Sequence, residues 1–250
     1  MKHLSGVQMI STILVIQHEE TGPPSWVGQW LTASGVALEV LHPFRGDKIP
    51  TEAPPHIAGL LVMGGSMGAN DDAVHPWLSD ERALMAICVE QDMPVLGICL
   101  GGQMLATAIG GLVTRAPVSE LGVHAFEVHD VAAGDLLFGP IASTEVLACQ
   151  WHQDYIAALP EHATILASNA NCPVQAFRVG QNAYGIQFHP EVDAAIFSSW
   201  LDGDIEVVEE SGRGLEEVKL EVGIAQGQLH ATWKPIVQTW AGMVHAYRRL

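Results

Sequence analysis

The chain has 250 residues, 48% of them hydrophobic, and its 28 acidic side chains outnumber 11 basic ones to give a formal net charge of −17. An acidic surface repels nucleic-acid phosphates, and the few basic residues do not cluster, so we expect no nucleic-acid partner. No apolar run approaches the roughly 20 residues of a membrane helix, and residues 1–10 do not resemble a signal peptide, so we expect no membrane partner.

Strand-like and helix-like segments alternate over the first half of the chain. Short apolar runs, typical of strands buried on both faces, lie at residues 12–17, 36–41, 60–63 and 95–98. Helical patterns lie at residues 25–33, at residues 77–90, and from residue 100 to the Gly110-Gly111 pair. This alternation predicts an α/β three-layer sandwich, with a mostly parallel central sheet and helices on both faces.

The second half of the chain has a different pattern. Strand-like segments at residues 124–128, 145–148, 164–168 and 174–179 predict an antiparallel extension of the sheet. Residues 202–221 are rich in acids, and apolar residues then recur at helical spacing from Trp233 to Tyr247, which predicts a helix that begins near Thr232 with Pro235 in its first turn. We predict one domain at residues 1–200 and a helical C-terminal extension at 201–250 packed on it.

The apolar run at residues 94–98 ends on Cys99, which glycines bracket and a predicted helix follows. Gly97, Gly101 and Gly102 let the backbone turn sharply, and the first amides of the helix place partial positive charge beside the sulfur, which favours a thiolate. The segment therefore indicates a nucleophilic thiol. A buried structural cysteine is the alternative, and Cys99 alone does not decide between them.

Two further segments supply the partners that thiol chemistry needs. Residues 184–191 run as a strand into a turn that carries His189 and Glu191. An imidazole can take the proton of a thiol and return one to the leaving group, while a carboxylate orients the ring. Residues 59–68 form another apolar strand that ends in glycines, whose amides could bind an oxyanion.

Together these segments resemble the class I glutamine amidotransferases, whose nucleophile lies in a Gly-x-Cys-x-Gly-x-Gln turn. The pattern here is Gly97-Ile98-Cys99-Leu100-Gly101-Gly102-Gln103, and the His-Pro-Glu signature of the family is His189-Pro190-Glu191. Residues 64–67 resemble its oxyanion segment, and His152-Gln153-Asp154 with Leu159-Pro160 resembles a further element. The resemblance covers residues 12–200 and is greatest with the glutaminase domain of GMP synthase.

The resemblance implies hydrolysis of the side-chain amide of glutamine to glutamate and ammonia by a Cys-His-Glu triad, with no cofactor. The site residues that it implies are Cys99, His189 and Glu191 as the triad, the amides of Gly65 and Leu100 as the oxyanion hole, and Gln103 as a substrate contact. The other histidines are scattered without ligand spacing, which predicts no metal site. The four cysteines form no CxxC pair and no disulfide framework, so we expect a cytoplasmic protein.

The sequence leaves the acceptor of the ammonia open. The Ser-Gly-Gly-x-Asp-Ser phosphate loop of the GMP synthase family does not occur in it. Ammonia would therefore pass to a synthase on another chain, or the enzyme would be a γ-glutamyl peptide hydrolase with water as the acceptor. Trp151 precedes His152 and is bulkier than the residue usual at that position in the family. A bulky residue there is compatible with a peptide substrate as well as with glutamine. A non-catalytic regulatory or binding module is the third hypothesis, and self-association into a homo-oligomer is compatible with all three.

Overall fold

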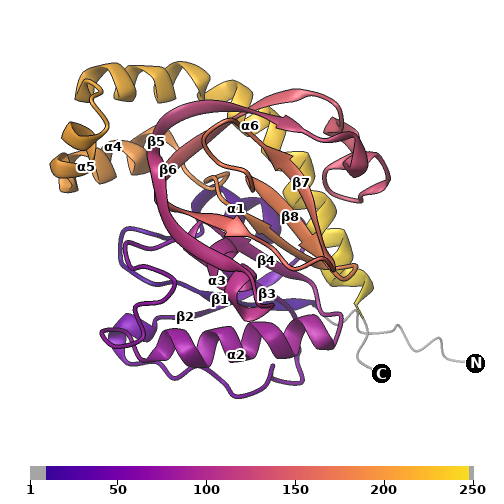
Figure 1. The fold of residues 1–250 in the computed structure, drawn as a ribbon. Coiled ribbons are helices and arrows are strands. Elements are labelled where there is room, and N and C mark those ends of the chain that lie inside the picture. The colour runs from indigo at the N-terminus through magenta and orange to yellow at the C-terminus, as the bar shows by residue number, and fades with distance from the viewer. Residues whose placement is uncertain (1–9, 248–250) are drawn as a thin grey trace, which may run out of the picture.

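Nine strands form one mixed sheet in the computed structural model, which describes residues 10–247 (Figure 1). One half is parallel, with the spatial order β2 (Ala37–Leu41), β1 (Thr12–Ile16), β3 (Ile57–Val62), β4 (Val95–Ile98) and β9 (Ala183–Ile186). The other half continues with antiparallel neighbours β8 (Ala176–Val179), β7 (Ala163–Ser168), β5 (Leu112–Val128) and β6 (Glu145–Ala158). The predicted α/β fold is confirmed, together with its antiparallel extension.

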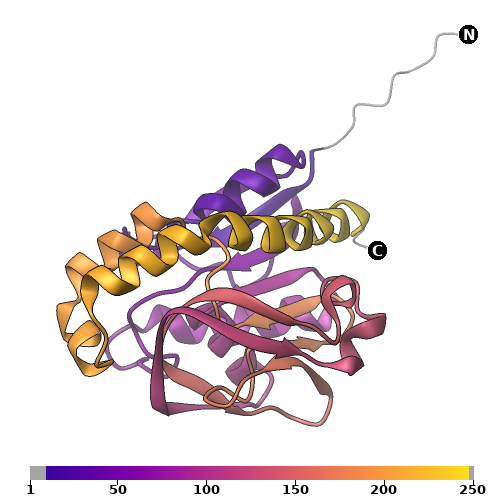
Figure 2. The same ribbon diagram turned by 90° about the horizontal axis from the view of Figure 1, so that it is seen from above.

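The sheet separates two hydrophobic cores, because successive side chains of a strand point to opposite faces. In β1, Ile13 and Val15 belong to one core, whereas Leu14 and Ile16 belong to the other. The first core is covered by α1 (Ser25–Ala33) and α6 (Leu215–Ala246), and the second by α2 (Trp77–Glu90) and α3 (Leu100–Ala108). Figure 2 shows α1 and α6 side by side on their face of the sheet.

Shorter elements connect these layers. They are the helices α4 (Ala194–Gly203) and α5 (Ile205–Glu210) and the 3₁₀ turns η1 (Pro43–Arg45), η2 (Asp130–Gly134) and η3 (Gly139–Ile141). Figure 1 shows α4 and α5 in orange at one end of α6, beside the curved hairpin of β5 and β6. None of the helices in residues 10–247 combines the length and apolarity that crossing a bilayer requires.

The C-terminal helix is longer than its apolar pattern predicts. It begins at Leu215 instead of near Thr232, so Pro235 lies in its interior and not in its first turn. An interior proline costs a helix about 3 kcal/mol. The helix continues because it buries an apolar stripe against the sheet and α1: Val218, Val222, Leu229, Trp233, Val237, Trp240 and Val244. The division of the chain at residue 200 stays a prediction.

The hairpin of β5 and β6 also exceeds the predicted strands, which cover only the end of β5 and the start of β6. The pairing register shifts between Arg115 and Glu120, on either side of Pro117, which cannot donate a ladder hydrogen bond. Strand β6 runs on to Ala158, so His152 lies within a strand and not in a surface loop. This extension brings β6 alongside the turn that follows β4.

Candidate active site

The thiol and the imidazole meet because β4 and β9 are parallel neighbours that end at the same edge of the sheet. Ile98 pairs with Ile186, and the Cys99 amide donates a 2.8 Å hydrogen bond to the Ile186 carbonyl. The glycine segment after β3 lies against both: a Cβ atom at Gly64 would lie 2.9 Å from His189 Cε1 and 3.5 Å from Cys99 Cβ. The three segments that the sequence singled out therefore converge at one point.

Cys99 occupies a sharp turn between β4 and α3. Its φ of 51° and ψ of −107° lie in a region that L-residues rarely adopt. The turn places Sγ 3.8 Å from the Trp151 carbonyl, to which the thiol donates, and 3.7 Å from Gln187 Nε2, which donates to the sulfur. Burial raises the pKa of the Cys149 and Cys172 thiols to about 12, so these two stay protonated.

His189 and Glu191 form a buried pair. Nδ1 of the imidazole lies 2.8 Å from Glu191 Oε1, and the two side chains are only 5% and 3% exposed. Burial alone would lower the pKa of His189, but the charge of Glu191 and the nearby Cys99 side chain raise it well above its ordinary value. The second ring nitrogen, Nε2, is buried and has no hydrogen-bond partner among residues 10–247. It is therefore free to exchange a proton at the site.

Trp200 of α4 covers the imidazole. Its ring packs edge-on against His189, with 5.0 Å between centroids and an angle of 71° between planes. The indole N–H donates a 2.8 Å hydrogen bond to the Thr21 carbonyl, which ties α4 to the segment after β1. Trp151 packs against Trp200 in turn, at 5.8 Å. The sequence alone places neither tryptophan in the active site. Its one indication is the bulk of Trp151, the residue before His152.

The predicted oxyanion donors are neighbours. Leu100 is the first residue of α3, so its amide N–H has no acceptor within the helix. A Cβ atom at Gly65 would lie 3.1 Å from Leu100 Cδ2, and both residues line a pocket that Cys99 also lines. Among the backbone hydrogen bonds of residues 10–247 outside regular helices and strands, none uses the Gly65 or Leu100 amide as its donor.

A buried pair that the sequence did not reveal holds the glycine segment. His18 Nδ1 donates a 3.0 Å hydrogen bond to the Gly64 carbonyl, and His18 Nε2 lies 2.8 Å from Glu81 Oε1 of α2. Because the C=O and N–H of one planar trans peptide point in opposite directions, a fixed Gly64 carbonyl also fixes the direction of the Gly65 N–H. His18 lies two residues after the end of β1, and Glu81 is an acid on the buried face of α2. These two positions are the only indication of the pair in the sequence.

Gln103 lies one turn beyond Cys99 in α3, is 4% exposed, and its side-chain amide donates to the Asp154 carbonyl at 3.1 Å and to Gln187 Oε1 at 3.2 Å. In this conformation it ties α3 to β6 and to the segment after β9. It also lines the pocket at Cys99.

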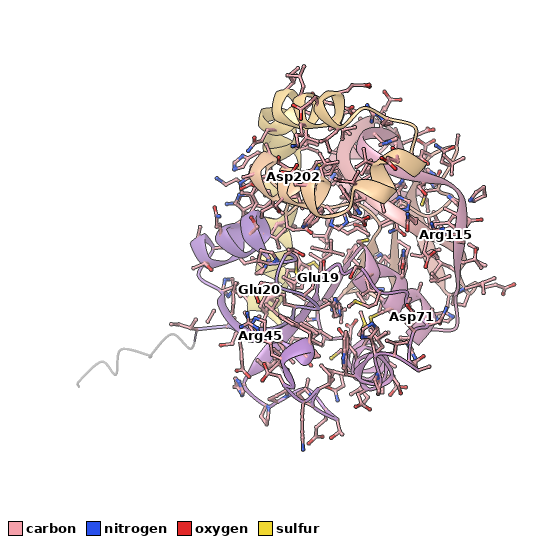
Figure 3. All side chains as sticks on the ribbon, turned by 90° about the vertical axis from the view of Figure 1, so that its left-hand side faces the viewer. Glu19, Glu20, Arg45, Asp71, Arg115 and Asp202 are labelled. Carbon is pink, nitrogen blue, oxygen red and sulfur yellow. The ribbon has the colours of Figure 1, made fainter. Side chains whose placement is uncertain are left out.

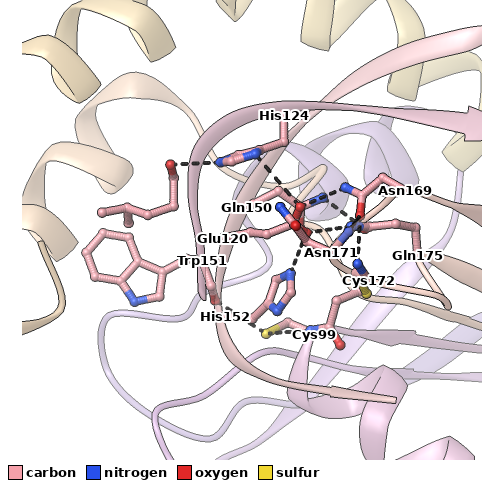
Figure 4. Close-up of polar contacts among 12 residues, drawn as sticks. Cys99, Glu120, His124, Gln150, Trp151, His152, Asn169, Asn171, Cys172 and Gln175 are labelled. Atoms are coloured by element: carbon pink, nitrogen blue, oxygen red, sulfur yellow. Dashed lines mark hydrogen bonds and ion pairs between the residues drawn. The ribbon is translucent and has the colours of Figure 1, made fainter. Parts of the chain in front are cut away.

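A second buried polar network supports the strand that carries Trp151. His152 Nε2 lies 3.0 Å from Glu120 Oε2, which also accepts a 2.7 Å hydrogen bond from Gln175, and Asn169 donates to Glu120 Oε1 at 2.7 Å (Figure 4). Burial alone would raise the pKa of Glu120, but the hydrogen bond and charge of His152 and the hydrogen bond from Asn169 lower it. The network fixes the position of the segment whose Trp151 carbonyl accepts from Cys99.

One group of side chains in residues 10–247 has ligand atoms within 4.8 Å of one another, close enough to hold a metal ion. Its members are Glu120, His152 and Cys172. The donor set does not fit a metal ion. Both Glu120 oxygens accept hydrogen bonds from neutral amides, and the Cys172 thiol donates to the Val174 carbonyl at 3.3 Å. A metal needs a thiolate, whereas the pKa of this thiol is raised to about 12.

Two pockets meet at Cys99, which lines both together with Gly65, Ser66, Trp151 and Asp204. The first, of about 340 Å³, is here called the His189 pocket, and the residues that line it alone include Glu19, Thr21, His189 and Trp200. The second, of about 310 Å³, is called the Gln103 pocket, and the residues that line it alone include Asp71, Leu100, Gln103, Arg115 and Asp154.

Comparison with known proteins shows the family to which the chain is similar. The family model for glutamine amidotransferase class-I matches residues 27–200. The chain is 34% identical over 157 residues to the glutamine-hydrolysing GMP synthase of Aeropyrum pernix, an alignment that covers 60% of this chain and 28% of that synthase. It is 32% identical over 142 residues to a glutamine-hydrolysing GMP synthase subunit from Methanococcus vannielii, covering 56% of this chain and 68% of that protein.

Solved structures extend the similarity to nearly the whole chain. A glutamine amidotransferase from Methylobacillus flagellatus superposes with a TM-score of 0.85 at 26% identity, covering 96% of this chain and 97% of the other. One from Thermotoga maritima gives a TM-score of 0.80 at 25% identity, covering 94% and 98%. The GMP synthases, in contrast, are longer: this chain spans about a quarter of the full-length synthases that it matches.

Proposed function

Because this chain belongs to the class I glutamine amidotransferase family, we propose that it hydrolyses a γ-glutamyl amide, as in glutamine, with Cys99 as nucleophile, His189 as acid and base, and Glu191 as the group that orients His189. One observation carries the proposal: the imidazole has one nitrogen bound to a buried carboxylate, and its other, unpartnered nitrogen lies in a pocket shared with a thiol. Acid–base catalysis by a triad requires this arrangement, because the carboxylate orients the ring while the other nitrogen exchanges the proton.

In the acylation step, the Cys99 thiolate attacks the γ-carbonyl carbon and negative charge develops on the carbonyl oxygen. The amides of Gly65 and Leu100 would donate to this oxygen, and losing one such donor typically raises the barrier by about 3 kcal/mol. The C–N bond then breaks as His189 Nε2 gives a proton to the leaving nitrogen, which leaves a thioester on Cys99.

In the second step, His189 takes a proton from water, and the resulting hydroxide adds to the thioester carbonyl. The C–S bond breaks, glutamate leaves, and Cys99 returns to its starting form. Glu191 stabilises the imidazolium that forms in each half of the cycle.

The Gln103 pocket fits the glutamyl end of such a substrate. A free γ-glutamyl group carries an ammonium and a carboxylate on its α-carbon. The pocket offers the acids Asp71 and Asp154 and the guanidinium of Arg115, and thus charges of both signs. Gln103 lines this pocket, one helical turn beyond Cys99 in α3.

The fate of the ammonia belongs to the same proposal. The similarity to a GMP synthase subunit supports transfer of the ammonia to a partner synthase chain. Hydrolysis of the thioester by water completes the cycle at this site without such a partner. We also keep a cytoplasmic location as part of the proposal.

Ammonia and glutamate released from L-glutamine test the proposed function. We expect turnover by the wild type, and a loss of at least about a thousandfold in Cys99→Ser, whose hydroxyl is a poorer nucleophile. Cys88→Ser is the matched control, since Cys88 is buried within α2 in the second core and lines neither of the two pockets at Cys99. Equal release by the wild type and Cys99→Ser contradicts the proposal.

A further inference from the structure

The His189 pocket is far larger than an ammonia molecule requires. Its volume is about 340 Å³, whereas a molecule of the size of water occupies about 30 Å³ in the liquid. We propose that this pocket binds the leaving amine of the substrate, and that this amine is an alkyl chain with a second, positively charged amino group. The inference rests on the proposed function and names its substrate class: γ-glutamyl amides of diamines.

The chemistry of the triad decides which pocket receives which half of the substrate. The leaving nitrogen takes its proton from His189 Nε2, so this nitrogen must lie on the His189 side of Cys99. His189 lines the first pocket and not the second, whereas Leu100 and Gln103 line the second and not the first. The chain attached to the leaving nitrogen therefore extends into the His189 pocket.

Apart from His189, the proposed acid and base, the charged side chains that line the His189 pocket are acidic. Glu19 and Asp204 line it, and no Lys or Arg does. Neither acid forms a salt bridge with a Lys or Arg of residues 10–247; Arg45, which follows β2, pairs with the neighbouring Glu20 instead. Figure 3 shows Glu19 near the centre of this face, with Glu20 and Arg45 to one side and Asp71 and Arg115 to the other.

The Glu19 carboxylate is held in place yet keeps acceptor capacity. Oε2 accepts from the Ser66 amide at 3.2 Å and from the Ser66 hydroxyl at 2.7 Å, and Oε1 accepts from the Thr21 hydroxyl at 3.1 Å. A carboxylate has about four lone-pair sites, so three donors leave room for an ammonium. Asp204 Oδ1 is more loosely engaged, as the acceptor of a 3.4 Å bond from the Val207 amide.

The aromatic wall of the pocket suits an alkylammonium chain. Trp151 and Trp200 are both partly exposed there, and their rings meet at a 74° angle. Indole faces attract cations and cover methylene groups at the same time. The Trp200 N–H is already bound to the Thr21 carbonyl, so what the side chain presents to the pocket is apolar and π-rich surface.

The reaction is a hydrolysis that the proposed triad already performs. The amide C–N bond breaks, the acyl group passes to Cys99 sulfur and then to the hydroxide derived from water, and the diamine leaves with the proton from His189. The products are glutamate and a free diamine. No oxidant, reductant or cofactor takes part.

Four γ-glutamyl amides that differ at one position test the inference: glutamine itself, and the amides of butylamine, of 1,4-diaminobutane and of 4-aminobutanoic acid. The chains of the last three have the same four carbons, with a neutral, a positive and a negative end. We expect kcat/KM for the diaminobutane amide to exceed that for the butylamide at least tenfold, and the aminobutanoate amide to be the poorest of the three.

Variants test which side chains recognise the positively charged end of the substrate. The preference for the diaminobutane amide over the butylamide should fall several-fold in Glu19→Gln and in Asp204→Asn. The asparagine keeps the Oδ1 atom that accepts from the Val207 amide. Glu20→Gln is the control, because Glu20 is adjacent in sequence, exposed and outside the pocket; its preference should match the wild type.

The outcomes separate the two proposals. If the wild type hydrolyses none of the four amides, the proposed function fails. If it hydrolyses glutamine or the butylamide, but the diaminobutane amide no better than the butylamide, the function stands and the inference is wrong. A preference for the cationic chain that Glu19→Gln and Asp204→Asn both leave intact also overturns the assignment of this pocket.

Discussion

His18 Nδ1 donates to the Gly64 carbonyl at 3.0 Å, while the other ring nitrogen faces Glu81 Oε1 at 2.8 Å. A carbonyl oxygen and a carboxylate oxygen are both acceptors, so the ring satisfies both only as an imidazolium. Burial alone would lower the pKa of His18, yet the charge and hydrogen bond of Glu81 raise it. A buried ion pair thus orients the peptide whose N–H is the proposed Gly65 oxyanion donor.

Loss of this donor to Gly64 should slow chemistry more than it weakens binding. We expect His18→Leu to lower kcat for glutamine by about ten- to a hundredfold, up to the effect of losing one oxyanion donor, with little change in KM. His18→Asn keeps a short N–H donor and should recover part of kcat. Steady-state kinetics of the two variants check this, and equal kcat values for both would contradict a positioning role.

The same ion pair predicts a pH dependence of stability. Because the folded state raises the pKa of His18 above its unfolded value of about 6.5, its contribution is fully present below pH 6.5 and is lost as the pH rises through the folded pKa. Urea unfolding of the wild type and His18→Asn at several pH values between 6 and 9 measures this. The stability difference between them should shrink toward pH 9, and a difference that grows would exclude the pair.

Glu191→Gln should preserve the packing around His189 and lose most of the activity. A glutamine side chain cannot stabilise the imidazolium, and replacing the carboxylate of a triad by its amide costs up to about 10⁴ in kcat. Because the charge of Glu191 raises the pKa of His189, that pKa should fall in the variant. NMR titration of the His189 ring gives the pKa, and kinetics give kcat; an unchanged kcat removes Glu191 from the triad.

The backbone strain at position 99 should be measurable in variants that lack the thiol. Cys99→Ala and Cys99→Gly are both expected to be inactive, but only glycine tolerates the φ of 51° and ψ of −107° without strain. Strain of this kind costs on the order of 1–3 kcal/mol. Cys99→Gly should therefore unfold at higher urea concentration than Cys99→Ala, and the opposite order would show that the turn relaxes.

Glycines at two places in the fold should respond to alanine in opposite ways. A Cβ atom at Gly101 would clash with the Val62 carbonyl, where α3 crosses β3, whereas one at Gly223 in α6 would meet nothing within 4 Å. We expect Gly101→Ala to destabilise the protein by several kcal/mol or prevent folding, and Gly223→Ala to stabilise it by about 0.5–1 kcal/mol. Thermal unfolding of both variants decides the matter.

The buried Glu120 should make the protein sensitive to acid. Its folded pKa lies below the ordinary value, so its contribution is present above about pH 4.5 and is lost as the pH falls through the folded pKa. We expect Glu120→Gln to lose about 2 kcal/mol at pH 7, as for a hydrogen bond to a charged group. Chemical unfolding at pH 7, 5 and 3 should show the same deficit at pH 7 and 5 and a smaller one at pH 3; a deficit that is equal at all three pH values would contradict it.

Local patterns were sufficient for the parallel half of the sheet and for the position of Cys99. An apolar run of four residues, a cysteine between glycines and a helical period afterwards are all readable within one short segment; β4 has the predicted bounds, and α3 has the predicted start and ends at Ala108, just before the glycine pair. The predictions were less accurate where packing outweighs local preference. Pro235 marks a helix start by its own chemistry, but the stripe from Val218 to Val244 keeps α6 continuous through it.

By itself, the sequence determined the order of strands and helices, the turn that exposes Cys99, and the segments that carry His189 and Glu191, because each of these depends on neighbouring residues. Only the tertiary structure decided that His18 and Glu81, 63 residues apart, meet beneath the glycine segment, and that Glu19 and Trp200 share a pocket. Such partners lie on different elements, and no periodicity along the chain records a contact that forms only when the helices and strands pack.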